Sequence, residues 1–442
     1  MQFLFTDMEI DVKFSTSVLL LLVLVTGSAC LDTTLVDRLD KDITDIEAPD
    51  QNGEAPAYHG ILVKGSDRQT TTLSNVNPGT GLIANDTFLD SGSTTPGLTT
   101  TLSKDLALAT TPTTDGTIVF IDRDHSVVTW LDPQTLSATA QMSVGEAGFG
   151  ANPHDYLPWG PEKAYVSRYG IVYGEDDKVV EGEDLIVLNP RTQELGVRID
   201  LSGLMSPAPN TTATTYARPS RLVKGDEHLF VVIQNFTPNW LGGDGVVAVI
   251  DPITDSIAGS VTFEGIRNCG GAAYRPQSET LLVACMGVFG EGAEGKLAGS
   301  AIVVVDVSDP TAPSVSRTIP ASELGDAPLG MTLVWLGEGY LLVVTDGIKD
   351  WGTGDIERHE IVWLVDLEVE NDEERFVNVY EGGPFDITVF ADPANARFYI
   401  GDAEDEDPRV EVFAFDVETG AFQAEQTLRF EEGLPPREIA GY

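Results

Sequence analysis

The sequence predicts an all-β protein, a seven-bladed β-propeller of four-stranded blades, on three observations. Gly (44) and Pro (25) separate short runs of Val, Ile, Leu, Tyr and Phe along the 442 residues. This is the pattern of many short strands joined by turns. A turn signature and an apolar run then recur together seven times. About four strands fit in each repeat, and such repeats arranged radially are propeller blades.

The turn signature begins with Asp or Asn, which in several copies is followed by Pro. The Asp or Asn side chain accepts backbone hydrogen bonds, and Pro presets the first turn dihedral, so each copy predicts the end of a strand. The copies begin 50 to 62 residues apart, at Asn77, Asp132, Asn189, Asp251, Asp306, Asp366 and Asp416.

An apolar run precedes each turn and is rich in β-branched and aromatic residues, as expected of a buried strand. A solenoid is the alternative, but solenoid repeats are usually shorter and commonly helical. The runs are 61–63, 118–120, 164–166, 229–231, 281–283, 341–343 and 398–400.

The two ends of the repeat region predict how the ring closes. Residues 435–442 resemble the inner strand of a blade with nothing after it, and 59–63 resemble a second strand with no inner strand before it. We expect these two segments to complete one blade together, which leaves no open sheet edge.

The N-terminal segment has the pattern of an export signal. Val18 to Val25 reads VLLLLVLV, too short to span a membrane comfortably, and small residues follow it up to Cys30. This resembles the bacterial lipoprotein signal, which implies lipidation of Cys30. Plain secretion is the alternative. Leu31, rather than Asp, after the cysteine favours the outer membrane or cell surface over inner-membrane retention.

These patterns divide the chain into three parts. Residues 1–29 are predicted to be a signal peptide, 30–57 the lipid-attachment cysteine with an acidic flexible linker, and 58–442 the propeller. The remaining cysteines, Cys269 and Cys285, flank two expected strands joined by a turn, so a cross-strand disulfide is predicted. Two free buried thiols are the alternative.

The residues Ala164-Tyr165-Val166-Ser167 and the spaced Asp-Pro-x-Thr turns resemble the YVTN-repeat family of β-propellers, over residues 58–442. The resemblance implies the fold and little about chemistry, because propellers host unrelated functions. Similar propellers include metal-dependent lactonases, but no full ligand set can be carried over to this chain.

The charge excludes some partners. With 70 acidic and 26 basic residues the net charge is −44, which repels nucleic acid and anionic lipid. Membrane contact is therefore expected only through the anchor. The acidic stretches 175–177 and 402–407 suggest Ca²⁺ as a possible cofactor, with solvated acidic loops as the alternative.

Function is expected on one face of the propeller. The loops after the second strands are long, and long loops on a rigid scaffold commonly carry function. The motifs of a nucleophile elbow, a P-loop, a zinc protease and a Rossmann fold are absent from the sequence, so no catalytic residue is assigned. The candidate ligand-binding residues are Arg123, His154, Asp155, Arg168, Tyr169, Asn235, Trp351 and Asp386.

Several of these residues have a second interpretation. Arg123 and Arg168 would hold an anion or pair with neighbouring acids, and Asp155 would bind or brace a turn. Trp240 and Trp351, in glycine-containing loops, would stack on a sugar or aromatic ligand, or bury their own loops. We expect a cell-envelope binding module for a small molecule, glycan or protein. The alternatives are a metal-dependent, lactonase-like hydrolase and a structural scaffold.

Overall fold

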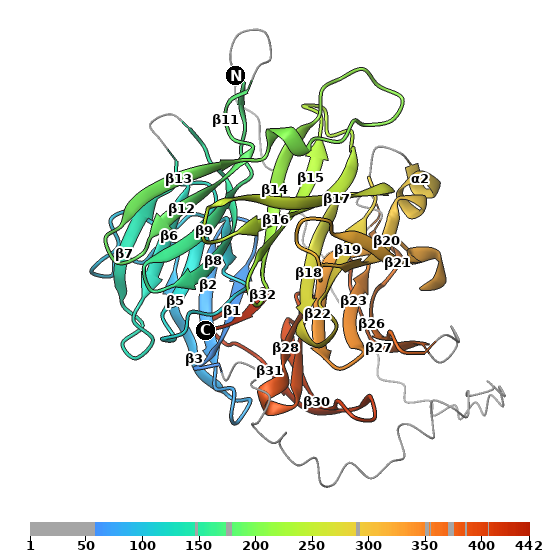
Figure 1. Cartoon of the computed structure of the whole chain (residues 1–442). Helices are drawn as coiled ribbons and strands as arrows, with labels where there is room; N and C mark the ends of the chain where they lie inside the picture. The colour runs from blue at the N-terminus through green and yellow to red at the C-terminus, as the bar shows by residue number, and fades with distance from the viewer. Residues whose placement is uncertain are drawn as a thin grey trace, which may run out of the picture. The chain divides into compact units, whose positions relative to one another are not determined.

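The computed structural model describes residues 58–442 except 146–148, 174–178, 289–291, 350–352, 354, 370–374, 385–386 and 405. Seven antiparallel four-stranded sheets follow one another along this part of the chain and form a ring of blades (Figure 1). The predicted all-β, seven-bladed propeller is therefore confirmed.

The blades are numbered here in chain order, and the strands of each are given from the inner to the outer strand. Blade 1 contains β32 (Pro436–Gly441), β1 (Ile61–Ser66), β2 (Thr71–Val76) and β3 (Ile83–Asp90). Blade 2 contains β4 (Leu106–Leu108), β5 (Ile118–Asp122), β6 (Val127–Leu131) and β7 (Ala138–Ser143). Blade 3 contains β8 (Pro153–Gly160), β9 (Lys163–Arg168), β12 (Asp184–Asn189) and β13 (Glu194–Asp200).

The remaining blades follow the same order. Blade 4 contains β14 (Tyr216–Lys224), β15 (Leu229–Phe236), β16 (Asp244–Asp251) and β17 (Ser256–Arg267). Blade 5 contains β18 (Cys269–Arg275), β19 (Thr280–Met286), β20 (Ser300–Asp306) and β21 (Ser314–Pro320). Blade 6 contains β22 (Leu329–Gly337), β23 (Tyr340–Thr345), β26 (Glu360–Asp366) and β27 (Phe376–Gly382). Blade 7 contains β28 (Ile387–Asp392), β29 (Arg397–Asp402), β30 (Arg409–Asp416) and β31 (Ala421–Leu428).

The repeated sequence signals lie where they were predicted. Each apolar run lies in the second strand of its blade, and each Asp or Asn turn joins the third strand to the fourth. Asp132 shows the mechanism, because its Oδ1 accepts the backbone N–H groups of Gln134 and Thr135 at 2.9 and 2.8 Å. The Asp132 side chain thus satisfies backbone donors of the turn itself, which have no partner strand.

Blade 1 closes the ring as predicted. The inner strand β32 pairs antiparallel with β1, so that Ile61 lies opposite Gly441 and Val63 opposite Ile439 (Figure 1). The backbone N–H of His59 also donates to the carbonyl oxygen of Tyr442 at 2.6 Å. Both ends of the described chain therefore share one sheet.

The hydrophobic core lies between neighbouring blades. Each buried cluster joins the facing sides of two adjacent sheets, as where Ile121 and Trp130 of blade 2 meet Tyr156 and Val166 of blade 3. Burial of one large apolar side chain stabilises a fold by roughly 1.5–3 kcal/mol. The stability of the ring is therefore distributed over its interblade contacts.

Polar contacts also join the blades. A side chain at the start of a third strand often accepts the backbone N–H of the next blade's inner strand. Glu183 accepts from Ala217 at 2.9 Å, and Glu360 accepts from Ile387 at 2.8 Å. These contacts hold the inner strands in register around the centre.

Second-to-third-strand loops and the connections between blades emerge on the same side, here called the long-loop face. The opposite side, where most turns are tight, is the short-turn face. The predicted long loops occur in blades 3 to 7, whereas residues 67–70 after β1 and 123–126 after β5 form short loops, and residues 109–117 of blade 2 form a longer loop on the short-turn face. Among the residues described, three second-to-third-strand loops carry extra elements: β10 (Val172–Tyr173) with β11 (Val179–Glu181), α2 (Gly292–Ala298), and β24 (Ile348–Lys349) with β25 (Ile356–Arg358). No helix in the described ranges has the length and apolarity needed to cross a membrane.

Candidate functional site

Two predicted site residues, His154 and Tyr169, meet on the long-loop face of blade 3. His154 is the second residue of the inner strand β8, and Tyr169 directly follows the second strand β9. Their rings stack with centroids 3.9 Å apart and an interplanar angle of 3°. The Tyr169 hydroxyl donates to Gln234 Oε1 at 2.7 Å, so the stack is fixed to blade 4.

Arg218 brings a positive charge to this stack from the inner strand β14. Its guanidinium lies 5.2 Å from the ring centroid of Tyr169 and 5.0 Å from that of Trp240, within the range of cation–π attraction. Its Nη1 donates to the Tyr169 carbonyl at 3.0 Å, and its Nη2 donates to the Tyr173 hydroxyl at 3.3 Å. Its buried Nε has no hydrogen-bond partner among the residues described. We call His154, Tyr169, Arg218 and Trp240 the basic aromatic cluster.

Trp240 is the exposed member of the cluster. It lies in the loop between β15 and β16, 56% of the residue is exposed, and its φ is 61°. The loop is tight, because the Thr237 N–H donates to the Leu241 carbonyl and the Trp240 N–H donates to the Thr237 carbonyl. A bulky side chain is rare in this left-handed conformation, which favours Gly or Asn.

Three arginines act on His154. Burial, and after it the positive charges of Arg123, Arg221 and Arg218, together lower the pKa of His154 to about 3. The imidazole is therefore neutral at neutral pH. Two of these arginines also have acidic partners: Arg123 Nε donates to Asp105 Oδ1 at 2.9 Å, and Arg221 Nη1 lies 3.7 Å from Asp155 Oδ2.

Asp155 lies next to His154 but is completely buried. Thr110 Oγ1 donates to both carboxylate oxygens at 3.1 and 3.0 Å, and the Leu222 N–H donates to Oδ2 at 2.9 Å. Burial raises the pKa of Asp155, while Arg221 and these hydrogen bonds lower it. Asp155 thus links blades 2, 3 and 4, and it acts on the cluster by fixing the inner strands.

Arg168 and Asn235 are also buried, each about 1% exposed. Arg168 Nε and Nη2 donate to the two carboxylate oxygens of Asp184 at 2.6 and 2.5 Å. Asn235 Nδ2 donates to the Asp244 carbonyl at 2.9 Å. Their described contacts brace the loops around the cluster. Trp351, Asp386 and Cys30 lie outside the described residues.

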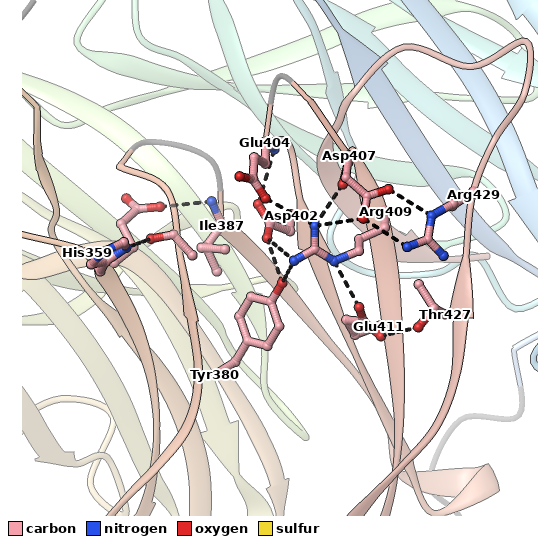
Figure 2. Close-up of polar contacts among 12 residues, drawn as sticks. His359, Tyr380, Ile387, Asp402, Glu404, Asp407, Arg409, Glu411, Thr427 and Arg429 are labelled. Carbon is pink, nitrogen blue, oxygen red and sulfur yellow. Dashed lines mark hydrogen bonds and ion pairs between the residues drawn. The ribbon is translucent and has the colours of Figure 1, made fainter. Parts of the chain in front are cut away.

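Acidic side chains of the loop after β29 are paired with an arginine of the same blade, Arg409 (Figure 2). The guanidinium of Arg409 contacts Asp402 Oδ2 at 3.1 Å and Glu404 Oε2 at 3.2 Å. It also donates to Glu411 Oε1 at 2.9 Å and to the Tyr380 hydroxyl at 2.6 Å. The other acidic stretch proposed for Ca²⁺, 175–177, lies outside the described residues. Within the part of the chain that the structure describes, no three His, Cys, Asp or Glu side chains are grouped to hold a metal ion.

The two propeller cysteines are joined. Cys269 and Cys285 are Cα partners of β18 and β19, both are fully buried, and the structure contains the disulfide between them. The Cys269 carbonyl accepts Gln234 Nε2 at 3.0 Å, and the same Gln234 side chain accepts the Tyr169 hydroxyl. Blade 5 therefore supports the cluster through Gln234.

Sequence reasoning missed Arg218 as a site residue. Its signal was a basic residue within an otherwise mostly apolar segment, Tyr216-Ala217-Arg218-Pro219, of a chain poor in basic residues. Burying a charged guanidinium costs free energy, so a buried arginine in an inner strand indicates a role for its charge. Which aromatic residues from other loops would surround it depends on the ring geometry, and a single sequence does not contain that information.

No family model and no curated protein matches this sequence. Among solved structures, a chain of Kuenenia stuttgartiensis hydrazine synthase is 13% identical, with a TM-score of 0.52, and the match covers 83% of this chain and 98% of that one. A Lactobacillus plantarum protein is 12% identical, with a TM-score of 0.52 and coverage of 87% and 99%. The β-propeller domain of Myceliophteria thermophila Cps50 (Swd1) is 11% identical, with a TM-score of 0.51 and coverage of 83% and 100%. At such identities the likeness shows the fold alone, and one fold hosts many functions.

Proposed function

We propose that this chain is a binding module that takes an anionic ligand at the basic aromatic cluster, and that it is not an enzyme. One observation carries the proposal: in a chain with a net charge of −44, the Arg218 guanidinium lies against the rings of Tyr169 and Trp240, and its buried Nε has no hydrogen-bond partner among the described residues. A positive site within a negative surround attracts and orients an anion. The exposed indole of Trp240 beside it supplies flat contact surface.

We further propose that the module is a YVTN-repeat propeller carried on the cell envelope by a lipid at Cys30, after removal of residues 1–29. The position of Tyr58, the first described residue, indicates on which face of the propeller the tether joins. It lies next to the start of β1, where Ile61 pairs with Gly441, and therefore on the short-turn face. A tether that joins there leaves the long-loop face free to meet ligand.

The hydrolase alternative requires a divalent ion at the channel mouth. The described residues do not fit such an ion, because they offer no grouped set of three ligands. The arginines around His154 would also repel a cation. No specific observation favours the scaffold alternative over a binding role.

The proposal is tested by removing two partly exposed arginine charges beside the cluster, Arg123 and Arg221, while its own buried Arg218 stays in place. The purified propeller is screened by thermal shift and calorimetry against inorganic sulfate and phosphate, small carboxylates and acidic oligosaccharides. We expect at least one anion to bind, and the double variant Arg123→Gln/Arg221→Gln to weaken it about tenfold or more. Arg191→Gln is the matched control, because Arg191 is exposed and lies in a turn of the short-turn face.

Two results would overturn the proposal. The first is that none of the anions binds. The second is that the double variant binds as tightly as the control.

A further inference from the structure

We propose that Trp240 is a stacking platform for a sugar ring, so that the ligand of the cluster is an acidic carbohydrate. This inference rests on the proposed anion-binding function and names its ligand class. The chemistry required is a pyranose ring that carries a carboxylate or sulfate group.

The first support is the backbone of Trp240. Its φ of 61° lies in the left-handed region, where glycine is unstrained and a bulky aromatic residue is not. The loop hydrogen bonds from Thr237 to Leu241 involve mainly backbone groups and would form equally well with glycine at position 240. The backbone hydrogen bonds of the loop therefore do not need the indole at this position, and strain of this kind concentrates at functional sites.

The second support is how the indole is held. The Arg218 guanidinium lies 5.0 Å from its ring centroid, and the Phe236 ring lies 5.6 Å away at an angle of 60°. Arg218 is itself fixed by the Tyr169 carbonyl and by the Tyr173 hydroxyl. The indole thus rests on an ordered support and still exposes 56% of its residue surface.

The third support is the combination of exposure and charge. An apolar ligand is normally enclosed by its pocket, whereas an exposed ring suits a ligand whose other side stays in water. A sugar meets this condition, because its hydroxyl groups remain solvated while its C–H face covers the indole. The Arg218 guanidinium, 5.0 Å from the centroid of the indole, then favours a sugar that carries a negative charge.

The experiment compares three probes by isothermal titration calorimetry and by tryptophan fluorescence. They are oligogalacturonate, a neutral oligogalactan of the same length, and sodium sulfate. We expect oligogalacturonate to bind wild-type protein about tenfold or more tightly than either other probe. We expect Trp240→Ala to weaken that binding about tenfold, the order of one lost stacking contact.

Two further variants make the result specific to the ring. Trp240→Gly removes the indole and keeps the left-handed backbone unstrained, so it should remain folded and should lose binding as Trp240→Ala does. Leu241→Ala is the matched control, because Leu241 is the next residue in the same loop and is 37% exposed. It should change the affinity less than about threefold.

The outcomes separate this inference from the proposed function. If Trp240→Gly binds oligogalacturonate as wild type does, or if sulfate binds as tightly as oligogalacturonate, the stacking role of Trp240 is contradicted. The proposed anion-binding function is not affected by either result. If the neutral oligogalactan binds as tightly as the acidic oligomer, the inference that the ligand is an acidic carbohydrate is contradicted. If no anion binds at all, the proposed function itself fails.

Discussion

At the scale of single residues, His154 shows how burial and neighbouring charge act together. The folded protein lowers the pKa of His154 from its ordinary value of 6.5 to about 3. Between pH 6.5 and about 3, the His154 imidazole therefore binds a proton in the unfolded chain but stays neutral in the folded chain. His154 should make folding progressively less favourable as the pH falls from 6.5 towards 3.

We predict that His154→Gln, which cannot titrate, reduces this loss of stability on acidification. Between pH 7 and pH 4.5 the wild type should lose about 1 to 3 kcal/mol more of its free energy of unfolding than the variant. Urea unfolding at several pH values measures the difference. His125→Gln is the control, since its ring lies at the surface beside Asp122. Parallel pH profiles for wild type and His154→Gln would contradict the prediction.

The candidate site was predictable only where local pattern places a residue. His154 follows Pro153 at the expected start of an inner strand, and Tyr169 follows an expected second strand, so both were placed on the correct face. Their stacking was not predictable, nor was the position of Arg218 between two rings from different loops. Such contacts depend on how far each blade is rotated relative to its neighbour, and strand periodicity does not contain that angle.

At the scale of elements, each blade repeats one plan, and the departures lie in the long loops. The plan was predictable because an Asp or Asn turn and a buried second strand leave local signals in every copy. The hairpin of β10 and β11 and the helix α2 were not predicted, because they lie in loops with no repeated counterpart. Blade 5 has one further constraint, the disulfide between its first two strands.

We predict that the double variant Cys269→Ala/Cys285→Ala unfolds more easily than the wild type. The cysteines are 16 residues apart, and closing a loop of that length restricts the unfolded chain by about 3 kcal/mol in the chain-entropy model. Urea unfolding with and without dithiothreitol measures the effect. Reductant should lower the wild-type midpoint and leave the double variant unchanged. An unchanged wild-type midpoint would contradict the prediction.

At the scale of the whole propeller, the ring also depends on the strand pairing that closes it. Six blades are built from consecutive segments, whereas blade 1 takes β32 from the other end of the repeat region. Opening that blade would expose unpaired strand edges, which invite aggregation. Two tyrosines pack across this closure: Tyr442 packs against Gly60, and Tyr58 packs against Gly441. A Cβ atom on Gly60 would lie 2.2 Å from the Tyr442 side chain, and one on Gly441 would lie 2.1 Å from the ring of Tyr58.

We predict that Gly60→Val loosens this closure, because its side chain cannot share the space that the Tyr442 ring occupies. Overpacking of this kind costs about 1–3 kcal/mol. Hydrogen exchange should accelerate in the peptides that contain β1 and β32 and remain unchanged in blades 3 and 4, since the interblade cores there are separate. Gly160→Val is the matched control, because a Cβ at Gly160 meets no atom within 4 Å. If both variants exchange alike, Tyr442 does not secure the closure, and the stability of the ring depends on the β1–β32 backbone pairing alone.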